Sequence, residues 1–338
     1  MALLLKRSIF SVITVISICF SVYAQQQERE SKLNPRLKFN ADGTFKVVQF
    51  TDIHYENGSS KNGRLLAMIA DILDREHPDI VLLTGDIVTS RPVESGWKVV
   101  VKPFIQRKIP WAVVLGNHDD KYDLNRNEIM VMLKKMPYSL VQPGPKYLGG
   151  SGNYVLRVKD SRGKKNMLLL YCLDSNAYTP IKGVGKYGWI KFRQIEWFRQ
   201  RSAHFTSIND NRPVPGAAFF HIPLPEFNEM WEPSGTKCIG RRNDDVCAPA
   251  INSGMFASLR ETEGIMGVFA GHDHNNDYAG CFHDICLAYG RVSGFDGYGT
   301  LRRGARVIEF IEGKHIFNSW IRTEDGKTVN RFTFPKSF

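Results

Sequence analysis

The chain has 338 residues, 43% of them hydrophobic, which is enough for a sizeable core in one large domain or two modest ones. Its formal charge of +11 favours anionic partners through long-range attraction. The basic residues are scattered, however, and no stripe alternates basic with aromatic residues, so we expect no nucleic-acid partner.

Residues 1–24 have the pattern of a secretory signal peptide. Lys6 and Arg7 precede an apolar stretch over residues 9–20, and cleavage is expected after Ala24. An uncleaved membrane anchor is the alternative, but the stretch is shorter than the roughly 20 apolar residues that span a bilayer. We therefore expect an exported protein, periplasmic or secreted, that has no stable membrane insertion after cleavage.

After a polar lead-in over residues 25–44, residues 45–338 are expected to form one domain. Short apolar runs bounded by turn residues predict buried strands, and apolar residues at helical spacing predict helices. The order β-α-β-α-β at its start is typical of a sheet with parallel neighbours and right-handed crossovers. The strands are expected at 45–50, 80–84 and 111–115, and the helices at about 65–77 and 97–105.

The pattern changes past residue 150, where strands follow one another with fewer helices. No repeat and no linker divides the chain, so one α/β domain built from two sheets with helices outside them fits best. Strands are expected at 154–158, 167–173, 217–220, 265–270, 306–311, 315–321 and 329–334, and a helix at about 189–201.

Five cysteines follow the predicted cleavage site. Cys238 and Cys247 are nine residues apart, and Cys281 and Cys286 are five apart, so two local disulfides are expected in an oxidising compartment. Four reduced thiols are the alternative. Cys172 lies inside a predicted strand and is expected to be a buried free thiol.

Five short motifs follow directly, or nearly so, on predicted strands. They contain the side chains that metal ions prefer, and loops at strand ends can gather distant segments of an α/β sheet into one site. Each motif alone is weak, because a turn or a core histidine explains it equally well. Together and in order they predict a metal centre. The motifs are Asp52-Ile53-His54, Gly85-Asp86, Gly116-Asn117-His118-Asp119, His221 and Gly271-His272-Asp273-His274.

The spacing suggests how two metals could be held. Asp86 is the natural bridge, because a carboxylate can give one oxygen to each of two cations, and two metals about 3.5–4 Å apart can share a hydroxide in a phosphoryl displacement. Asp52 and His54 alternate along an extended segment and can reach the same metal. His272 and His274 alternate in the same way, yet a loop can direct them to different metals.

The remaining polar residues complete the expected site. Asn117 offers an amide oxygen and His221 another imidazole, and such a mixed set suits Fe, Mn or Zn better than Ca or Mg. His118 is expected to face the phosphate and donate a proton to the departing alkoxide. Asp119 is placed to orient or charge the His118 imidazole.

As a set, these motifs resemble the calcineurin-like metallophosphoesterases, the superfamily that includes the purple acid phosphatases. The resemblance covers residues 52–274 and implies a four-layer α/β/β/α sandwich of two mixed β-sheets flanked by helices, a phosphate-ester substrate and two divalent or trivalent metal ions. It further implies these ligands: Asp52, His54, Asp86 and His274 for one metal, and Asp86, Asn117, His221 and His272 for the other.

Two residues depart from the purple acid phosphatases. Those enzymes carry an iron-binding tyrosine three residues after the bridging aspartate, where this chain has Thr89, and they lack a histidine at the position of His54. The chain thus resembles the non-purple members and the short proteins grouped with the purple enzymes. No tyrosinate-to-iron absorption band is expected.

The expected activity is hydrolysis of phosphomonoesters by a metal-bound hydroxide without a phosphoenzyme. A phosphodiesterase acting on nucleotides or lipid-linked phosphates is the alternative enzyme, and a catalytically silent binding protein is the alternative of another class. The insertion between His221 and about residue 260 and the region 281–303 either shape the substrate pocket or merely extend the fold.

Overall fold

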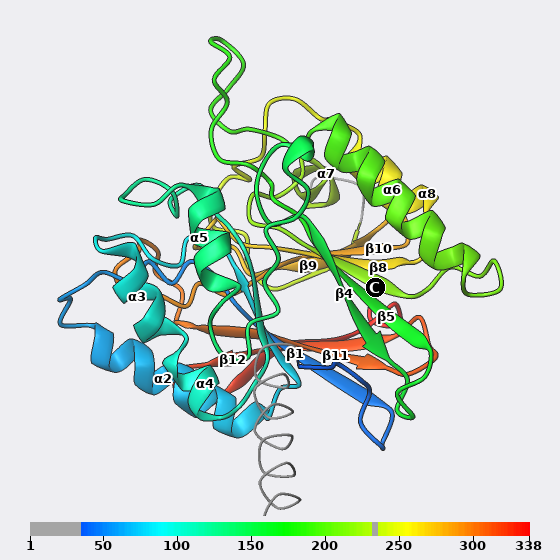
Figure 1. The fold of residues 1–338 in the computed structure, drawn as a ribbon, viewed down its shortest axis with the longest axis horizontal. Helices are drawn as coiled ribbons and strands as arrows, with labels where there is room; N and C mark the ends of the chain where they lie inside the picture. Colours follow the sequence, from blue (N-terminus) through cyan, green and yellow to red (C-terminus); the bar gives the residue numbers. More distant parts are fainter. Residues whose placement is uncertain (1–34, 232–235) are drawn as a thin grey trace, which may run out of the picture.

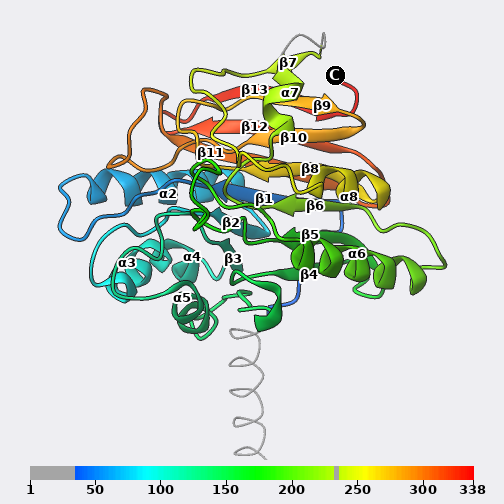
Figure 2. The same cartoon turned by 90° about the horizontal axis from the view of Figure 1, so that it is seen from above.

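The computed structural model describes residues 35–231 and 236–338, so the predicted signal peptide lies outside the described residues. Two mixed β-sheets pack face to face, and helices lie on the outer side of each (Figures 1 and 2). The layers are therefore helix, sheet, sheet and helix, which confirms the predicted α/β sandwich. Within these ranges, no helix is both long enough and apolar enough to span a bilayer.

The first sheet combines three strands from the start of the domain with three from its end. Its elements are β1 (Thr44–Phe50), α2 (Asn62–Glu76), β2 (Ile80–Thr84), α3 (Val93–Val100), α4 (Lys102–Gln106), β3 (Trp111–Val114), α5 (Arg126–Leu133), β11 (Gly304–Ile311), β12 (Phe317–Thr323) and β13 (Thr328–Phe334). The strand order is β13-β12-β11-β1-β2-β3. The neighbours β1, β2 and β3 are parallel, so their carboxyl ends meet at one edge.

The second sheet has seven strands and carries α6 and α8 on its outer side (Figure 2). Its elements are η1 (Lys146–Leu148), β4 (Tyr154–Lys159), β5 (Asn166–Cys172), α6 (Phe192–Ser207), β6 (Gly216–Phe219), α7 (Glu226–Trp231), β7 (Cys238–Ile239), α8 (Met255–Glu261), β8 (Ile265–Ala270), β9 (Ala279–Phe282) and β10 (Ile285–Tyr289). The order is β4-β5-β6-β8-β10-β9-β7, and β5, β6, β8 and β10 are parallel neighbours.

The helix expected over 97–105 is divided in the structure. It forms α3 and α4, and Pro103 lies in the first turn of α4, where its missing amide costs no hydrogen bond. Helix α5 was not among the predicted elements. Its signal was a capping box, in which Asn125 and Glu128 each accept a hydrogen bond from the other's backbone amide, just before an apolar run.

Part of the predicted lead-in belongs to the packed domain. Leu37 is 7% exposed and Phe39 is 2% exposed, and the Phe39 ring lies 5.9 Å from the ring of Phe45. The amide of Phe39 also donates to the carbonyl of Lys159 at 2.9 Å. Apolar and basic residues alternate here, as in a half-buried strand. The domain therefore begins before residue 45.

The cysteines differ from the expected pattern, because the five described cysteines are free thiols. Cys238 lies on β7, which pairs with β9, whereas the backbone amide of Cys247 donates to Asp273 at 3.2 Å. The predicted Cys238–Cys247 disulfide is thus not formed. Cys281 and Cys286 face each other across β9 and β10 but are not bonded. The buried free thiol of Cys172 is confirmed.

A buried arginine joins the two sheets. The guanidinium of Arg306 on β11, with no exposed surface, donates to the carbonyls of Tyr289 at 2.5 Å and Asp277 at 2.8 Å and to the hydroxyl of Ser319 at 3.0 Å. Burial lowers the pKa of Arg306 to about 10, and the charge of Asp277 opposes this shift. The side chain therefore satisfies oxygens of both sheets where water cannot reach them.

Arg306→Met should lower the free energy of unfolding by about 3 kcal/mol or more, because several buried oxygens would lose their donor. Urea unfolding measures this change. Arg302→Met removes an exposed ion pair with Asp325 and is the matched control, with an expected change of about 0.5 kcal/mol or less. Equal effects of the two substitutions would contradict the proposed role of Arg306.

Candidate metal centre

The two sheets bring the predicted ligands together at their strand ends. Asp52, Asp86 and Asn117 follow β1, β2 and β3, which end at one edge of the first sheet. His221 and His272 follow the parallel strands β6 and β8 of the second sheet. Loops from both sheets therefore meet at one place, as the order of the motifs predicted.

The side chains form two groups whose ligand atoms lie within 4.8 Å of one another. In the first group, the Nε2 atoms of His54 and His274 are 3.2 Å apart, close to Asp52. The second group consists of these three residues: Asp86, His221 and His272. In it, Nδ1 of His272 lies 3.2 Å from Nε2 of His221.

Asp86 lies between the two groups. Its Oδ2 is 3.3 Å from Nε2 of His221 and 3.8 Å from Nε2 of His54. Its Oδ1 accepts a hydrogen bond from the backbone amide of His118 at 2.7 Å. This is the geometry expected of a carboxylate that serves both cations.

The hydrogen bonds around the groups leave ligand atoms free. Nδ1 of His221 donates to the carbonyl of Thr84 at 2.8 Å, and Nδ1 of His274 donates to that of Tyr298 at 2.9 Å, so each neutral ring keeps its Nε2 lone pair for a metal. Asn117 is oriented in a similar way, since its Nδ2 donates to the hydroxyl of Tyr178 at 2.8 Å.

Two buried oxygens of predicted ligands have no hydrogen-bond partner among the residues that the structure describes: Oδ1 of Asp52 and Oδ1 of Asn117. Buried polar atoms are normally paired, so unpaired acceptors among imidazole rings indicate a place for cations. Mixed carboxylate, amide and imidazole donors suit Fe, Mn or Zn. The residues therefore fit a pair of metal ions.

Charge and burial oppose each other in this cluster. Burial alone would lower the pKa of His221, but the carboxylates of Asp86 and Asp52 outweigh it and raise that pKa to about 10. Burial lowers the pKa of His54 to about 4 and that of His272 to about 3. Two buried carboxylates thus favour positive charge between them, while two of the rings favour the neutral form that binds metals.

Residues 45–276 match the calcineurin-like phosphoesterases. The chain belongs to this family. It is 33% identical over 332 residues to the probable inactive purple acid phosphatase 14 of Arabidopsis thaliana, covering 88% of this chain and 82% of that protein. It is 32% identical over 323 residues to phosphatase DCR2 of Saccharomyces cerevisiae, covering 85% of this chain and 55% of that protein.

The fold is also similar to that of a solved structure. A dimetal phosphatase from Danio rerio superposes with a TM-score of 0.57 at 13% sequence identity, covering 86% of this chain and 98% of that one. At such low identity the likeness concerns the fold alone. In this calcineurin-like phosphoesterase, the buried His and Asp groups are of the kind typical of a dinuclear metal site in the family.

The ligand loops have an unusual backbone. Asp52, His54, Asp86 and His272 all have positive φ angles, of 52°, 47°, 54° and 84°. Such angles are uncommon outside glycine and persist where the surroundings enforce them. Four of the seven predicted ligands thus lie in loops whose conformation must be held by other contacts.

Asp119 supplies some of those contacts. Its carboxylate accepts hydrogen bonds from the backbone amides of Asp86 at 2.9 Å, Ile87 at 2.8 Å and Gly116 at 2.7 Å. The contact expected between Asp119 and the His118 ring is not found among the described residues. The two carboxylate oxygens of Asp119 bind the loops after β2 and β3, so Asp119 fixes the backbone that carries the predicted ligands Asp86 and Asn117. Burial and then the charge of Asp86 raise the pKa of Asp119 to about 6.

His118 has a different partner, Lys121, which the sequence analysis missed. Nζ of Lys121 lies 3.1 Å from Nδ1 of His118 and 2.8 Å from the hydroxyl of Tyr178. Lys121 lies three residues after His118, but no pattern in the sequence distinguishes it from other surface lysines. Burial is the largest of the causes that lower the pKa of His118.

A cavity of about 440 Å³ is lined by His118 and by residues of both ligand groups. Two tyrosines form its walls: the ring of Tyr298 stacks on that of His274 with centroids 3.9 Å apart, and Tyr187 meets His272 edge-on at 4.6 Å. Lys186 also lines it. Because Tyr298 comes from the region 281–303, that region shapes the pocket, and Cys247 of the insertion lines it too.

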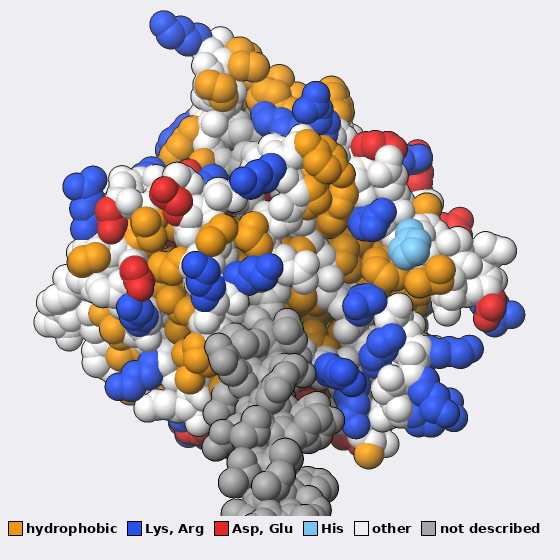
Figure 3. Space-filling view, in the orientation of Figure 1, with side chains coloured by type: hydrophobic (Ala, Val, Ile, Leu, Met, Phe, Trp, Pro, Cys, Tyr) orange, Lys and Arg blue, Asp and Glu red, His pale blue; other side chains and the backbone are white. Residues whose placement is uncertain are grey.

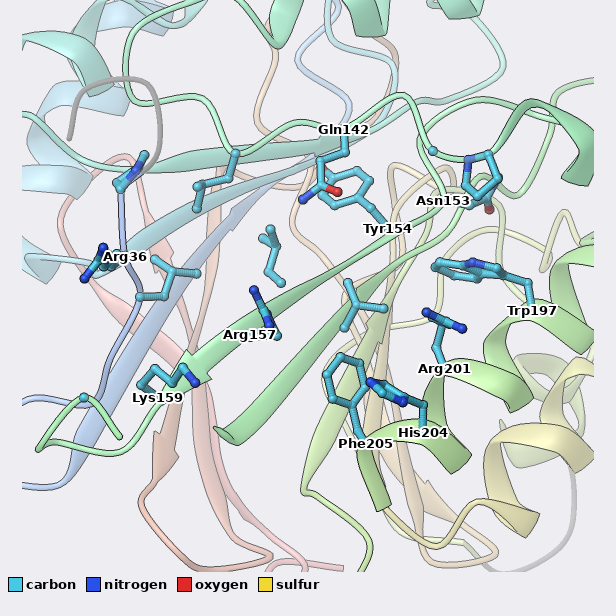
Figure 4. A pocket seen from close by; sticks show the side chains of 18 residues that line it. Arg36, Gln142, Asn153, Tyr154, Arg157, Lys159, Trp197, Arg201, His204 and Phe205 are labelled. Atoms are coloured by element: carbon cyan, nitrogen blue, oxygen red, sulfur yellow. The ribbon is translucent and has the colours of Figure 1, made fainter. Parts of the chain in front are cut away.

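A larger cavity of about 770 Å³ lies elsewhere, between β4 and α6 (Figure 4). Arg36, Arg157 and Arg201 line it, and basic side chains gather on the surface over these elements (Figure 3). None of the predicted ligands lines this cavity, and neither does His118. Metal chemistry therefore belongs to the smaller pocket.

Gly116→Ala should abolish most metal binding. A Cβ at Gly116 would lie 2.2 Å from Oδ1 and 2.4 Å from the backbone nitrogen of Asp86, so the carboxylate and the loop that carries it would both have to move. Elemental analysis after loading with Mn, Fe or Zn measures the bound metal. Gly63→Ala, with nothing within 4 Å of the added atom, is the matched control and should retain full metal content. Full metal content in both variants would contradict the assignment of Asp86.

Proposed function

We propose that this chain is a dinuclear-metal phosphomonoesterase that uses water as the nucleophile and forms no phosphoenzyme. The observation that carries the proposal is that five of the seven predicted ligands line one pocket together with His118, while the other two, Asp52 and His221, lie in the same ligand groups. A site that had lost its activity through evolutionary decay would commonly have lost one of these groups.

The residues divide the proposed work among themselves. Two bound cations would supply Lewis-acid activation of water and neutralise charge on the phosphoryl group. Asp86 and the other ligands would hold those cations, and the ring of His118 would protonate the departing oxygen. Lys186 and Lys121 would attract the dianionic phosphate toward the pocket, since charged groups at a concave mouth raise the local concentration of the substrate.

A catalytically silent binding protein is the second candidate. It is favoured by the name of a similar Arabidopsis protein, a probable inactive purple acid phosphatase, whereas the similar yeast protein is named a phosphatase. The complete ligand set of this chain supports the active alternative. A phosphodiesterase remains the alternative enzyme, because two metals can serve either reaction. Export through a cleaved signal peptide is likewise a proposal.

Turnover of an aryl phosphomonoester and of its bis-ester, with Mn, Fe and Zn supplied in turn, tests the activity. The monoester should be the faster substrate. Asp86→Asn should abolish turnover, and His118→Asn should reduce kcat by roughly 10²- to 10⁴-fold on an alkyl ester, as expected for loss of a general acid. His204→Asn, on the exposed side of α6, is the control and should leave kcat unchanged.

Three outcomes separate the candidates. A faster bis-ester would favour the phosphodiesterase. No turnover of either ester with any metal, together with less than one metal per chain, would favour the silent protein. Unchanged turnover in Asp86→Asn or His118→Asn would contradict the mechanism.

The iron-loaded protein should show no visible absorption band from charge transfer between tyrosinate and iron. Thr89 occupies the position of the purple enzymes' iron-binding tyrosine, and a threonine hydroxyl gives no such charge-transfer absorption. A visible spectrum recorded before and after loading with iron tests this expectation. A purple colour would show that another tyrosine binds the metal and would overturn the ligand assignment.

A further inference from the structure

We propose that Lys121 is a positioning residue that fixes the ring tautomer of His118, so that Nε2 carries the proton for the leaving group. This inference rests on the proposed phosphoesterase activity and deepens it. It begins from the 3.1 Å contact between Nζ of Lys121 and Nδ1 of His118.

An ammonium group has three donors and no acceptor. The ring nitrogen that faces Lys121 must therefore accept the hydrogen bond, and the proton of the neutral ring lies on the other nitrogen, Nε2. Since His118 lines the pocket with Nδ1 already engaged, Nε2 is the nitrogen available to the substrate. Lys121 thus keeps the neutral His118 ring in the tautomer whose Nε2 is a hydrogen-bond donor.

A carboxylate beside Nδ1 would have the opposite effect. It would accept the Nδ1 proton and leave Nε2 as an acceptor, so the ring could act as an acid only after gaining a second proton. Asp119 does not take this role, because its oxygens bind backbone amides. Among the residues that the structure describes, Lys121 is the one side chain recorded within hydrogen-bond distance of the His118 ring.

Tyr178 holds Lys121 in place. Its hydroxyl accepts from Nζ of Lys121 at 2.8 Å and from Nδ2 of Asn117 at 2.8 Å, and its ring lies 4.8 Å beneath the ammonium. One tyrosine thus orients both Lys121 and the amide of Asn117, which is a predicted metal ligand. Tyr178 belongs to a loop that includes Lys186 and Tyr187 and projects from the body of the molecule (top of Figure 1).

The proposed reaction is a single displacement at phosphorus in which His118 protonates the leaving group. The bond from phosphorus to the ester oxygen breaks while a bond forms from phosphorus to the oxygen of the attacking water. The Nε2 proton of His118 passes to the departing alkoxide, which leaves as an alcohol, while Nδ1 takes a proton from the ammonium of Lys121, so the ring stays neutral. The proton released by the water returns to Lys121 through solvent. Protonation matters most for an alkoxide, which is a poor leaving group, and least for a nitrophenolate.

The test compares Lys121→Met with the wild-type protein on an alkyl phosphate and on a nitrophenyl phosphate. We expect kcat to fall by roughly 10- to 100-fold on the alkyl ester and by less than about threefold on the aryl ester. Lys121→Arg should restore the alkyl activity in part, because a guanidinium is also a donor without an acceptor. Lys186→Met is the comparison within the same pocket and should raise KM for both esters alike.

A second readout does not depend on turnover. Nitrogen-15 NMR spectra of histidine-labelled, zinc-loaded protein distinguish the two neutral tautomers of a ring. The wild-type His118 should carry its proton on Nε2, and Lys121→Met should populate the other tautomer. Circular dichroism checks that the variants are folded.

Two results would overturn the inference. One is an equal loss of kcat on both esters in Lys121→Met, and the other is a wild-type ring protonated on Nδ1. Failure of the wild-type protein to hydrolyse either ester with any metal would instead defeat the proposed function, and the NMR spectra would still show whether Lys121 sets the tautomer.

Discussion

The structure depends on how two buried carboxylates, those of Asp52 and Asp86, are compensated. Both are almost fully buried, at 1% and 2% exposure, and burying an unpaired charge is very costly. Imidazole rings from both sheets surround them, that of His54 from the first sheet and those of His221 and His274 from the second. Both residues have positive φ angles, and Asp119 stabilises the loop that carries Asp86 by accepting hydrogen bonds from its backbone amides. The ligand geometry is therefore set by backbone hydrogen bonds behind the site.

The sequence predicted the parts of the molecule in which the local pattern and the tertiary structure agree. The strand at Ile80–Thr84 is a continuous apolar run, and Asp86 follows it after a glycine, so both the strand and the position of the carboxylate were predictable. The same reasoning placed His221 and His272, because parallel strands end at one edge. These predictions needed only apolar runs and the rules of sheet topology.

The contacts that tune the site could not be predicted in this way. Lys121 and Tyr178 are 57 residues apart and meet through a loop without apolar periodicity, so no local pattern indicated their contact. Asp119 was interpreted as a partner of His118 because it is its neighbour, yet the chain turns and directs the carboxylate to Asp86 and Gly116. Cys247 failed as a disulfide partner for a similar reason, since spacing does not determine where an irregular insertion folds back.

The division of ligands between the sheets links chemistry to stability. The first sheet supplies carboxylate and amide oxygens, from Asp52, Asp86 and Asn117, while the second supplies the imidazoles of His221 and His272. A cation bound between them would join the two halves of the sandwich at the strand ends, in addition to the link made by Arg306. A ligand that binds the folded state alone raises its stability by mass action. Metal binding would therefore be thermodynamically coupled to the packing of the two sheets.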